Sequence, residues 1–202
     1  MHLCTVQSVM IALFLAGCAD QSSVKSVELL DERTGATMGA LREPIAFIET
    51  GLYDLLATSP QQASVSTWGP QFRILYLGPV EWDRSGEYTY GLWVQVAPGV
   101  GGHRLDDIRA RGAVTLKLDD GPVTLSTIDL PKEARSPYSP MLPWGKTTYF
   151  AIDVAVLKRM AASKKTVLTF RAADLTMVEF IPFQEPNTAL TRFLHERGIT
   201  VD

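Results

Sequence analysis

The sequence EYTYGLWVQVA, residues 87–97, constrains the fold more than any other part of the chain, because its apolar and polar residues alternate. A repeat of two residues is typical of a β-strand with one buried and one exposed face. We therefore expect a strand here, with its apolar side chains packed on a core. The apolar face carries Tyr88, Tyr90, Leu92, Val94 and Val96, and the polar face carries Glu87, Thr89 and Gln95.

Turn signals join this strand and others into hairpins. The preceding sequence, QFRILYLGPVEW, is apolar on both faces, and residues 83–86 (DRSG) supply the turn between the two strands. A second turn, DDG at 119–121, is expected to join the strand residues 114–118 to 123–125. Three more strands are predicted in TTYFAI, TVLTFRA and TMVEFIPF, which are rich in Thr, Val and Phe.

Two helices are expected to interrupt the strands. Asp153 can serve as the N-cap of a helix that runs to Ser163, and Asn187 can serve as the N-cap of the last helix. Gly198 is placed where it would end that last helix. The buried positions are expected to be Val154, Leu157, Ala161, Leu190, Phe193 and Leu194.

Many short strands with turns between them predict a mainly β fold. An antiparallel β-sandwich is expected, with the two short helices covering an edge or an end of it. A small β-barrel is the alternative, because the same strand pattern fits both. At 46% hydrophobic and 20% charged residues, the composition is ordinary for a globular chain. Residues 26–202 suit a single domain.

An apolar run near the N-terminus ends on a cysteine. Residues 9–16 are too few to cross a bilayer, which takes about 20 helical residues. They fit the apolar region of a secretory signal peptide, and a buried helix of a cytosolic protein is the alternative. No Lys or Arg precedes the run, although signal peptides normally begin with positive charge, so we expect a start codon upstream. The residues Leu15, Ala16, Gly17 and Cys18 resemble the lipobox of bacterial lipoproteins.

This resemblance implies a route to the membrane. Residues 1–17 would be removed as a signal peptide, Cys18 would carry acyl chains such as palmitate, and residues 18–25 would form a short tether. Each buried CH₂ of an acyl chain contributes about 0.8 kcal/mol to membrane binding, so two or three chains anchor stably. The protein would then face the periplasm from the cell envelope. Ala19 after the cysteine favours the outer membrane over the inner one.

Cysteine usage and charge exclude several functions. Cys4, the only other cysteine of the chain, lies in the segment that would be removed, so the mature chain would contain no free thiol and no disulfide. A cysteine nucleophile, a cysteine-based zinc site and a redox dithiol are therefore excluded. The formal net charge is −3, with Lys and Arg spread along the chain. A nucleic-acid partner is not expected, because binding phosphates requires a basic surface.

A histidine in a glycine-rich stretch is the main candidate for catalysis. His103 lies in GVGGHRLDD, near Asp106 and Asp107, and could act as a general base or a metal ligand. The alternative is a loop with solvated charges. His195 falls on the polar face of the last helix. A metal site needs several ligands, so these two histidines do not predict one. The glycines do not match a nucleotide-binding spacing. We therefore assign no catalytic residue, no metal ligand and no cofactor.

The segment RSPYSPMLPWG, residues 135–145, has a proline at every third position. That spacing favours an extended, stiff backbone. Its apolar side chains could plug one end of the sandwich. The other hypothesis is an exposed loop that binds an envelope protein, because rigid aromatic residues are frequent at interface hot spots. The partner-binding residues in that hypothesis are Tyr138, Met141, Leu142 and Trp144.

The sequence ELLDERTGATMGALREPIAF is similar to the start of uncharacterised proteobacterial envelope lipoproteins with a D-x-x-T-G-A-T stretch, here Asp31, Thr34, Gly35, Ala36 and Thr37. The resemblance implies the same location and assigns no site. We therefore expect a lipid-anchored lipoprotein that acts as a non-enzymatic binding or structural module. The alternatives are a periplasmic carrier of an apolar ligand held between its sheets and a periplasmic hydrolase.

Overall fold

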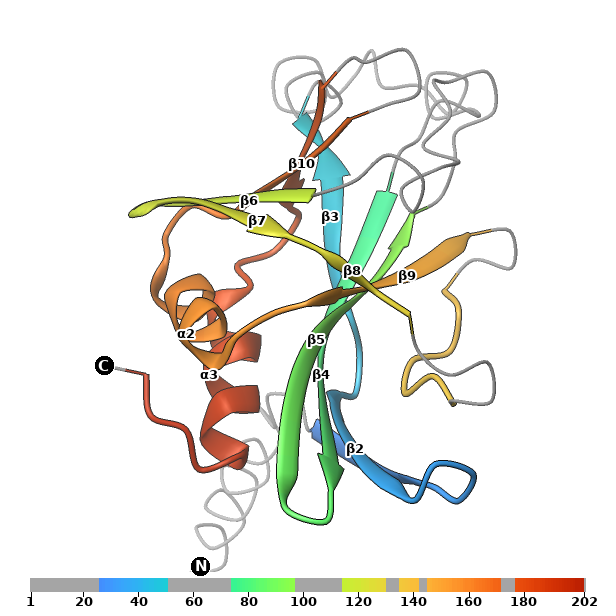
Figure 1. The fold of residues 1–202 in the computed structure, drawn as a ribbon. Coiled ribbons are helices and arrows are strands. Elements are labelled where there is room, and N and C mark those ends of the chain that lie inside the picture. The colour runs from blue at the N-terminus through green and yellow to red at the C-terminus, as the bar shows by residue number, and fades with distance from the viewer. Residues whose placement is uncertain are drawn as a thin grey trace, which may run out of the picture.

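The computed structural model describes residues 26–50, 74–96, 114–129, 135–141, 145–171 and 177–201 (Figure 1). Its strands belong to one 11-stranded antiparallel sheet. They are β1 (Ser26–Asp31), β2 (Ala36–Leu41), β3 (Ile45–Glu49), β4 (Ile74–Arg84), β5 (Glu87–Val96), β6 (Val114–Leu118), β7 (Gly121–Leu125), β8 (Thr127–Ile128), β9 (Lys146–Ala151), β10 (Val167–Arg171) and β11 (Met177–Pro182). Two helices are described, α2 (Val154–Ala162) and α3 (Asn187–Glu196).

The sheet bends until its two edges come close together. Its strand order is β7-β6-β10-β11-β3-β4-β5-β9-β8, and β1 and β2 extend it beside the far end of β4. β7 and β8 are consecutive in sequence, yet β7 pairs with β6 at one edge and β8 pairs with β9 at the other. Segment 121–128 therefore nearly closes the sheet into a barrel-like shape. The expected mainly β, antiparallel fold with two helices is confirmed, and the curvature is compatible with the barrel alternative.

Local turn chemistry accounts for the hairpins. Ser85 and Gly86 join β4 to β5 with φ values of +57° and +88°. Two left-handed residues in succession are typical of the tight turn that matches the twist of a hairpin. The N–H of Gly86 also donates a hydrogen bond of 2.7 Å to Oδ1 of Asp83. The hairpins expected at 83–86 and 119–121 are confirmed, as are the strands β9, β10 and β11.

The two helices lie together on one side of the bent sheet (Figure 1). Their buried residues are Leu157, Met160, Ala161, Leu190, Phe193 and Leu194. Val154 is half-buried, so its expected full burial is wrong, because Met160 rather than Val154 completes the inner stripe. Neither α2 nor α3, the helices of the described ranges, has the length and apolarity needed to cross a membrane.

The helix ends differ from expectation in their caps. Asp153 is the N-cap of α2, but its side chain makes no capping hydrogen bond. In α3 the N-cap is Pro186 rather than Asn187. Proline is well placed at a helix start, because the first N–H groups have no partner within the helix. The stop at Gly198 is confirmed, since its φ is +71° and its N–H donates to the carbonyl of His195 over 3.0 Å.

The predicted alternation of buried and exposed side chains does not hold in β5: residues 87–89 are all exposed, and the expected packing of Tyr88 on the core is wrong, since its side chain is 57% exposed. From Gly91 onward both faces are buried, and Trp93 and Gln95 are 0% exposed. The expected polar face at Gln95 is therefore wrong. Segment 135–141 covers that face, and the N–H of Met141 donates a 2.8 Å hydrogen bond to Oε1 of Gln95. The polar side chain is buried because a backbone donor satisfies it.

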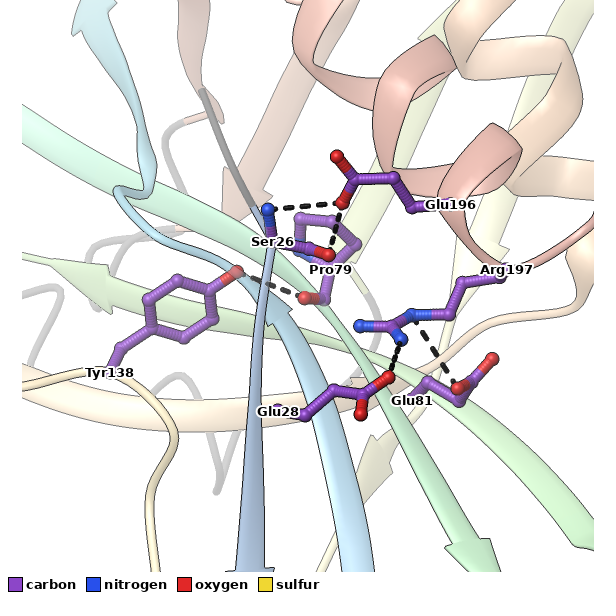
Figure 2. A network of polar contacts seen from close by, with 7 residues as sticks. All are labelled: Ser26, Glu28, Pro79, Glu81, Tyr138, Glu196 and Arg197. Atoms are coloured by element: carbon purple, nitrogen blue, oxygen red, sulfur yellow. Dashed lines mark hydrogen bonds and ion pairs between the residues drawn. The ribbon is translucent and has the colours of Figure 1, made fainter. Parts of the chain in front are cut away.

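Arg197, just after α3, ties that helix to the sheet. Its side chain is 7% exposed, its Nη1 lies 2.7 Å from Oε1 of Glu28 and its Nε lies 3.5 Å from Oε1 of Glu81 (Figure 2). The guanidinium also stands 5.5 Å from the ring centre of Phe193. A buried carboxylate such as Glu81 is stable only beside a compensating charge. The ion pairs thus fix the C-terminal helix across β1 and β4.

Candidate functional site

A cleft of about 730 Å³ opens where β9 stops alongside β5. Four chain segments meet there, namely the β1–β2 turn, the β4–β5 hairpin, β8 and the link from β9 to α2. The volume is within the range of about 300–1,000 Å³ that is usual for ligand sites. The cleft is therefore the candidate binding site, and its backbone and side chains decide what it can bind.

The edge of β5 is exposed within this cleft. β4 pairs with β5 along the whole strand, whereas β9 pairs only with residues 91–96. Ile152 donates one last hydrogen bond, of 3.3 Å, to the carbonyl of Tyr90, and the chain then turns into α2. In an antiparallel strand, alternate residues direct their N–H and C=O groups to the same neighbour. The N–H and C=O of Tyr88 therefore point away from β4, past the end of β9 and into the cleft.

Trp82 forms an apolar surface on one face of this edge. It pairs with Thr89 in the β4–β5 register, so the two side chains share a face. Its ring lies over Gly91, where a Cβ atom would stand 2.7 Å from Cζ3 of the indole. The indole also packs 5.8 Å from the ring of Tyr149. Because these contacts fix the ring, Trp82 is an ordered wall of the cleft.

Tyr88 and Tyr90 lie on the opposite face, since alternate strand residues share a side. Tyr88 is 57% exposed, whereas Tyr90 is half-buried. Burial, and then a hydrogen bond with the Glu81 carboxylate, raise the pKa of Tyr90 well above its usual range. The hydroxyl of Tyr90 is therefore protonated at neutral pH and donates to Glu81. Through Glu81 and Arg197, this wall of the cleft is connected to α3.

Negative charge predominates around the cleft. Its lining includes the carboxylates of Asp31, Glu87 and Asp153, together with the single cation Arg84 among the described lining residues. A hydrogen bond of 2.7 Å from Oγ1 of Thr34 lowers the pKa of Asp31, so this carboxylate is charged at neutral pH. Because the side chain of Asp153 does not cap α2, its carboxylate is left to face solvent and the cleft. The site therefore favours a positively charged ligand.

The D-x-x-T-G-A-T stretch forms the β1–β2 turn beside the cleft. Asp31 accepts hydrogen bonds at its carboxylate from Thr34 and from the N–H of Arg33, and at its carbonyl from the N–H of Gly35. Gly35 has a φ of +66°, which favours glycine. Ala36 then begins β2. These turn contacts, with one further hydrogen bond of 3.4 Å that the Asp31 carboxylate accepts from the N–H of Arg135, account for these residue types.

Tyr138, one of the residues of the partner-binding hypothesis, belongs to the core. It is 4% exposed, its ring lies over Gly78, and the ring centre is 4.9 Å from that of Trp93. Its hydroxyl donates to the carbonyl of Pro79 over 2.9 Å (Figure 2). The same hydroxyl accepts from the N–H of Leu41 over 3.0 Å. The hydroxyl thereby bridges β2 and β4 just past their last paired residues. A side chain enclosed in this way presents no surface to a partner.

The other predicted site residues have different positions. Met141 is 49% exposed at the end of segment 135–141. Leu142, Trp144, Cys18 and His103 lie outside the described residues. His195 is exposed on α3, as its place on the polar face predicted. Among the described residues, no three His, Cys, Asp or Glu side chains are grouped so that they could hold a metal ion.

The sequence offered no direct signal for the cleft, because its residues come from four separate segments. The one local hint in the sequence is that the first half of the strand at 87–96 carries two tyrosines, Tyr88 and Tyr90. No protein-family model, curated protein or solved structure matches this chain.

Proposed function

We propose that the chain is a lipid-anchored lipoprotein of the cell envelope that acts as a non-enzymatic binding module. The observation that carries the binding role is the cleft beside β5, with its exposed strand edge, its fixed Trp82 wall and its excess of carboxylates. In this proposal the module faces the periplasm, its ligand is part of an envelope protein, and the outer membrane is the favoured location.

The anchor in this proposal is Cys18. It is supported by the four residues that resemble a lipobox and by the apolar run before them. Acyl chains on Cys18 would hold the module near the membrane through the tether at 18–25. Since β1 begins at Ser26, the first described strand would start directly after that tether.

Binding in the cleft is favoured over binding inside the sheet. The inner positions of the central strands are filled by side chains such as Leu75, Leu77 and Leu92, each 0% exposed. Interiors of this kind are close-packed, so an apolar ligand between the layers would have to displace them. The cleft, in contrast, is open to solvent and already has the volume to hold a ligand.

The anchor is tested by labelling cells with radioactive palmitate. The wild-type protein should carry the label and sediment with membranes, whereas the Cys18→Ser variant should carry none. A variant in which Ser22 is replaced by alanine is the matched control, because it alters the tether and keeps the cysteine. Absence of label from the wild-type protein would refute the anchor.

The binding role is tested by photo-crosslinking in cells. A benzoylphenylalanine in place of Thr89, which is exposed and lines the cleft, should crosslink to a discrete envelope protein. The same group in place of Phe183, which is 58% exposed and outside the cleft lining, is the control. Equal crosslinking from both positions, or none from position 89, would contradict a binding role for the cleft.

A further inference from the structure

We infer that the cleft recognises an extended peptide segment, which adds to the exposed edge of β5 as a further strand. The inference rests on the proposed binding function and specifies its ligand class and its mode of recognition. The free edge covers residues 87–89, because the carbonyl of Tyr90 already accepts from Ile152, and these residues correspond to about 10 Å of strand at the usual rise per residue. A peptide of four to six residues in extended form would continue the position that β9 leaves.

The backbone supplies the first argument. Tyr88 directs its N–H and C=O into the cleft, as deduced from the β5 register and from the Ile152–Tyr90 hydrogen bond. A donor and an acceptor on one residue form a pair of hydrogen bonds with one residue of an antiparallel neighbour. Free sugars or amines have no regular alternation of such groups, whereas an extended peptide does. Addition of a strand to a sheet edge is a known mode of peptide recognition.

The flanking side chains supply the second argument. A peptide residue placed opposite Thr89 would direct its side chain to the same face as Thr89, toward Trp82. The ordered indole provides an apolar surface for that side chain, and Ala36 and Ile128 are further apolar residues of the cleft lining. Residues on either side of it would point to the Tyr88 face. The edge therefore favours a peptide with an apolar residue at the position opposite Thr89.

Charge supplies the third argument. Asp31, Glu87 and Asp153 outnumber Arg84 among the described residues around the cleft. Like charges across an interface are unfavourable, and complementary charges direct the choice of partner. The peptide is thus expected to carry Lys or Arg beside its apolar residue. A second copy of this chain would bring another β5 edge with the same carboxylates, which disfavours pairing between two copies.

The test uses a phage library of random 12-residue peptides, selected on the full chain held in a non-ionic detergent. The strongest peptide is then synthesised and its affinity measured by calorimetry. In the Tyr88→Pro variant the N–H that points into the cleft is lost and no β4 hydrogen bond is removed, so affinity should fall about tenfold. The Tyr88→Ala variant retains that N–H and is the matched control, with a change of less than about threefold.

Two further measurements keep the test decisive if Tyr88→Pro fails to fold. Methylation of each peptide N–H in turn should weaken binding at every second residue, as expected for a strand that pairs on one side. Replacing Glu87 by glutamine should lower the affinity for the peptide. The same replacement at Glu185, an exposed residue outside the cleft lining, should leave that affinity unchanged. Selected sequences should contain an apolar residue next to Lys or Arg.

Several results would overturn the inference. These are a library that yields no enriched peptide, equal affinity for the Tyr88→Pro and Tyr88→Ala variants, or a methylation scan without alternation. A chain that sediments as a dimer and becomes monomeric in the Tyr88→Pro variant would assign the edge to a second copy instead. Crosslinking from position 89 is independent of these results, so a failed recognition mode is distinguishable from a cleft that binds nothing.

Discussion

Removing a single oxygen atom from Tyr138 should destabilise the fold measurably. The Tyr138→Phe substitution keeps the ring between Gly78 and Trp93 but removes both hydrogen bonds of the hydroxyl. The N–H of Leu41 and the carbonyl of Pro79 would then be buried without these partners. An unsatisfied buried backbone group costs about 1–3 kcal/mol. We expect the free energy of unfolding to fall by about 2–3 kcal/mol, because the two groups can relax partly toward each other.

Urea denaturation followed by circular dichroism measures this loss. The slope of the free energy against urea should stay unchanged, and the melting temperature should fall by roughly 4–12 °C for a chain of this size. The Tyr88→Phe substitution is the control, because the same oxygen is lost from a side chain that is 57% exposed. A loss below about 0.5 kcal/mol in Tyr138→Phe, equal to that of the control, would refute the bridging role of the hydroxyl.

Three further results are expected. Burial raises the pKa of Tyr138 above its ordinary 10.0, so the unfolded state loses its proton first. Stability should thus be constant below pH 10 and fall above it, by about 1.4 kcal/mol per pH unit for this group, and urea titrations of Tyr138→Phe should show the shallower decline. Replacing Arg197 with methionine should lower the free energy of unfolding by about 3 kcal/mol, because Glu81 loses its cation. The control Arg159→Met removes an exposed ion pair and should lower it clearly less, and equal losses in urea titrations would contradict the prediction. Replacing Ser85 with asparagine should raise the free energy of unfolding by up to about 1 kcal/mol, because asparagine adopts the left-handed conformation more readily. The melting temperature should rise slightly, and a lower melting temperature would argue against strain in this turn.

Features encoded by neighbouring residues could be predicted from the sequence. The hairpin turns at 83–86 and 119–121 depend on a few consecutive residues, and so does the end of α3 at Gly198. The β1–β2 turn carried the same kind of signal in its Asp, Thr and Gly. Its residue types are explained by the hydrogen bonds of Asp31 within that turn.

Features that depend on distant segments could not be predicted. Gln95 looked exposed because its neighbours alternate, but the backbone of Met141 satisfies and covers it. For Tyr138 the sequence left burial and exposure both open, and it could not show that the hydroxyl fits between two backbone groups on β2 and β4. The cleft exists because β9 ends before β5 does. Where a strand ends relative to its neighbour is set by the whole sheet, and no local pattern reports it.

The placement of β11 beside β3 has a consequence for how the chain folds. Phe180 pairs with Glu49, so a strand near the start of the described chain receives its neighbour only from a strand near the end. Contacts between residues far apart in sequence slow folding, since a long loop must close before any pairing stabilises it. Until β10 and β11 have been made and inserted, the edges of β3 and β6 lack partners. A chain shortened at its C-terminus would present both edges to other chains and is expected to aggregate.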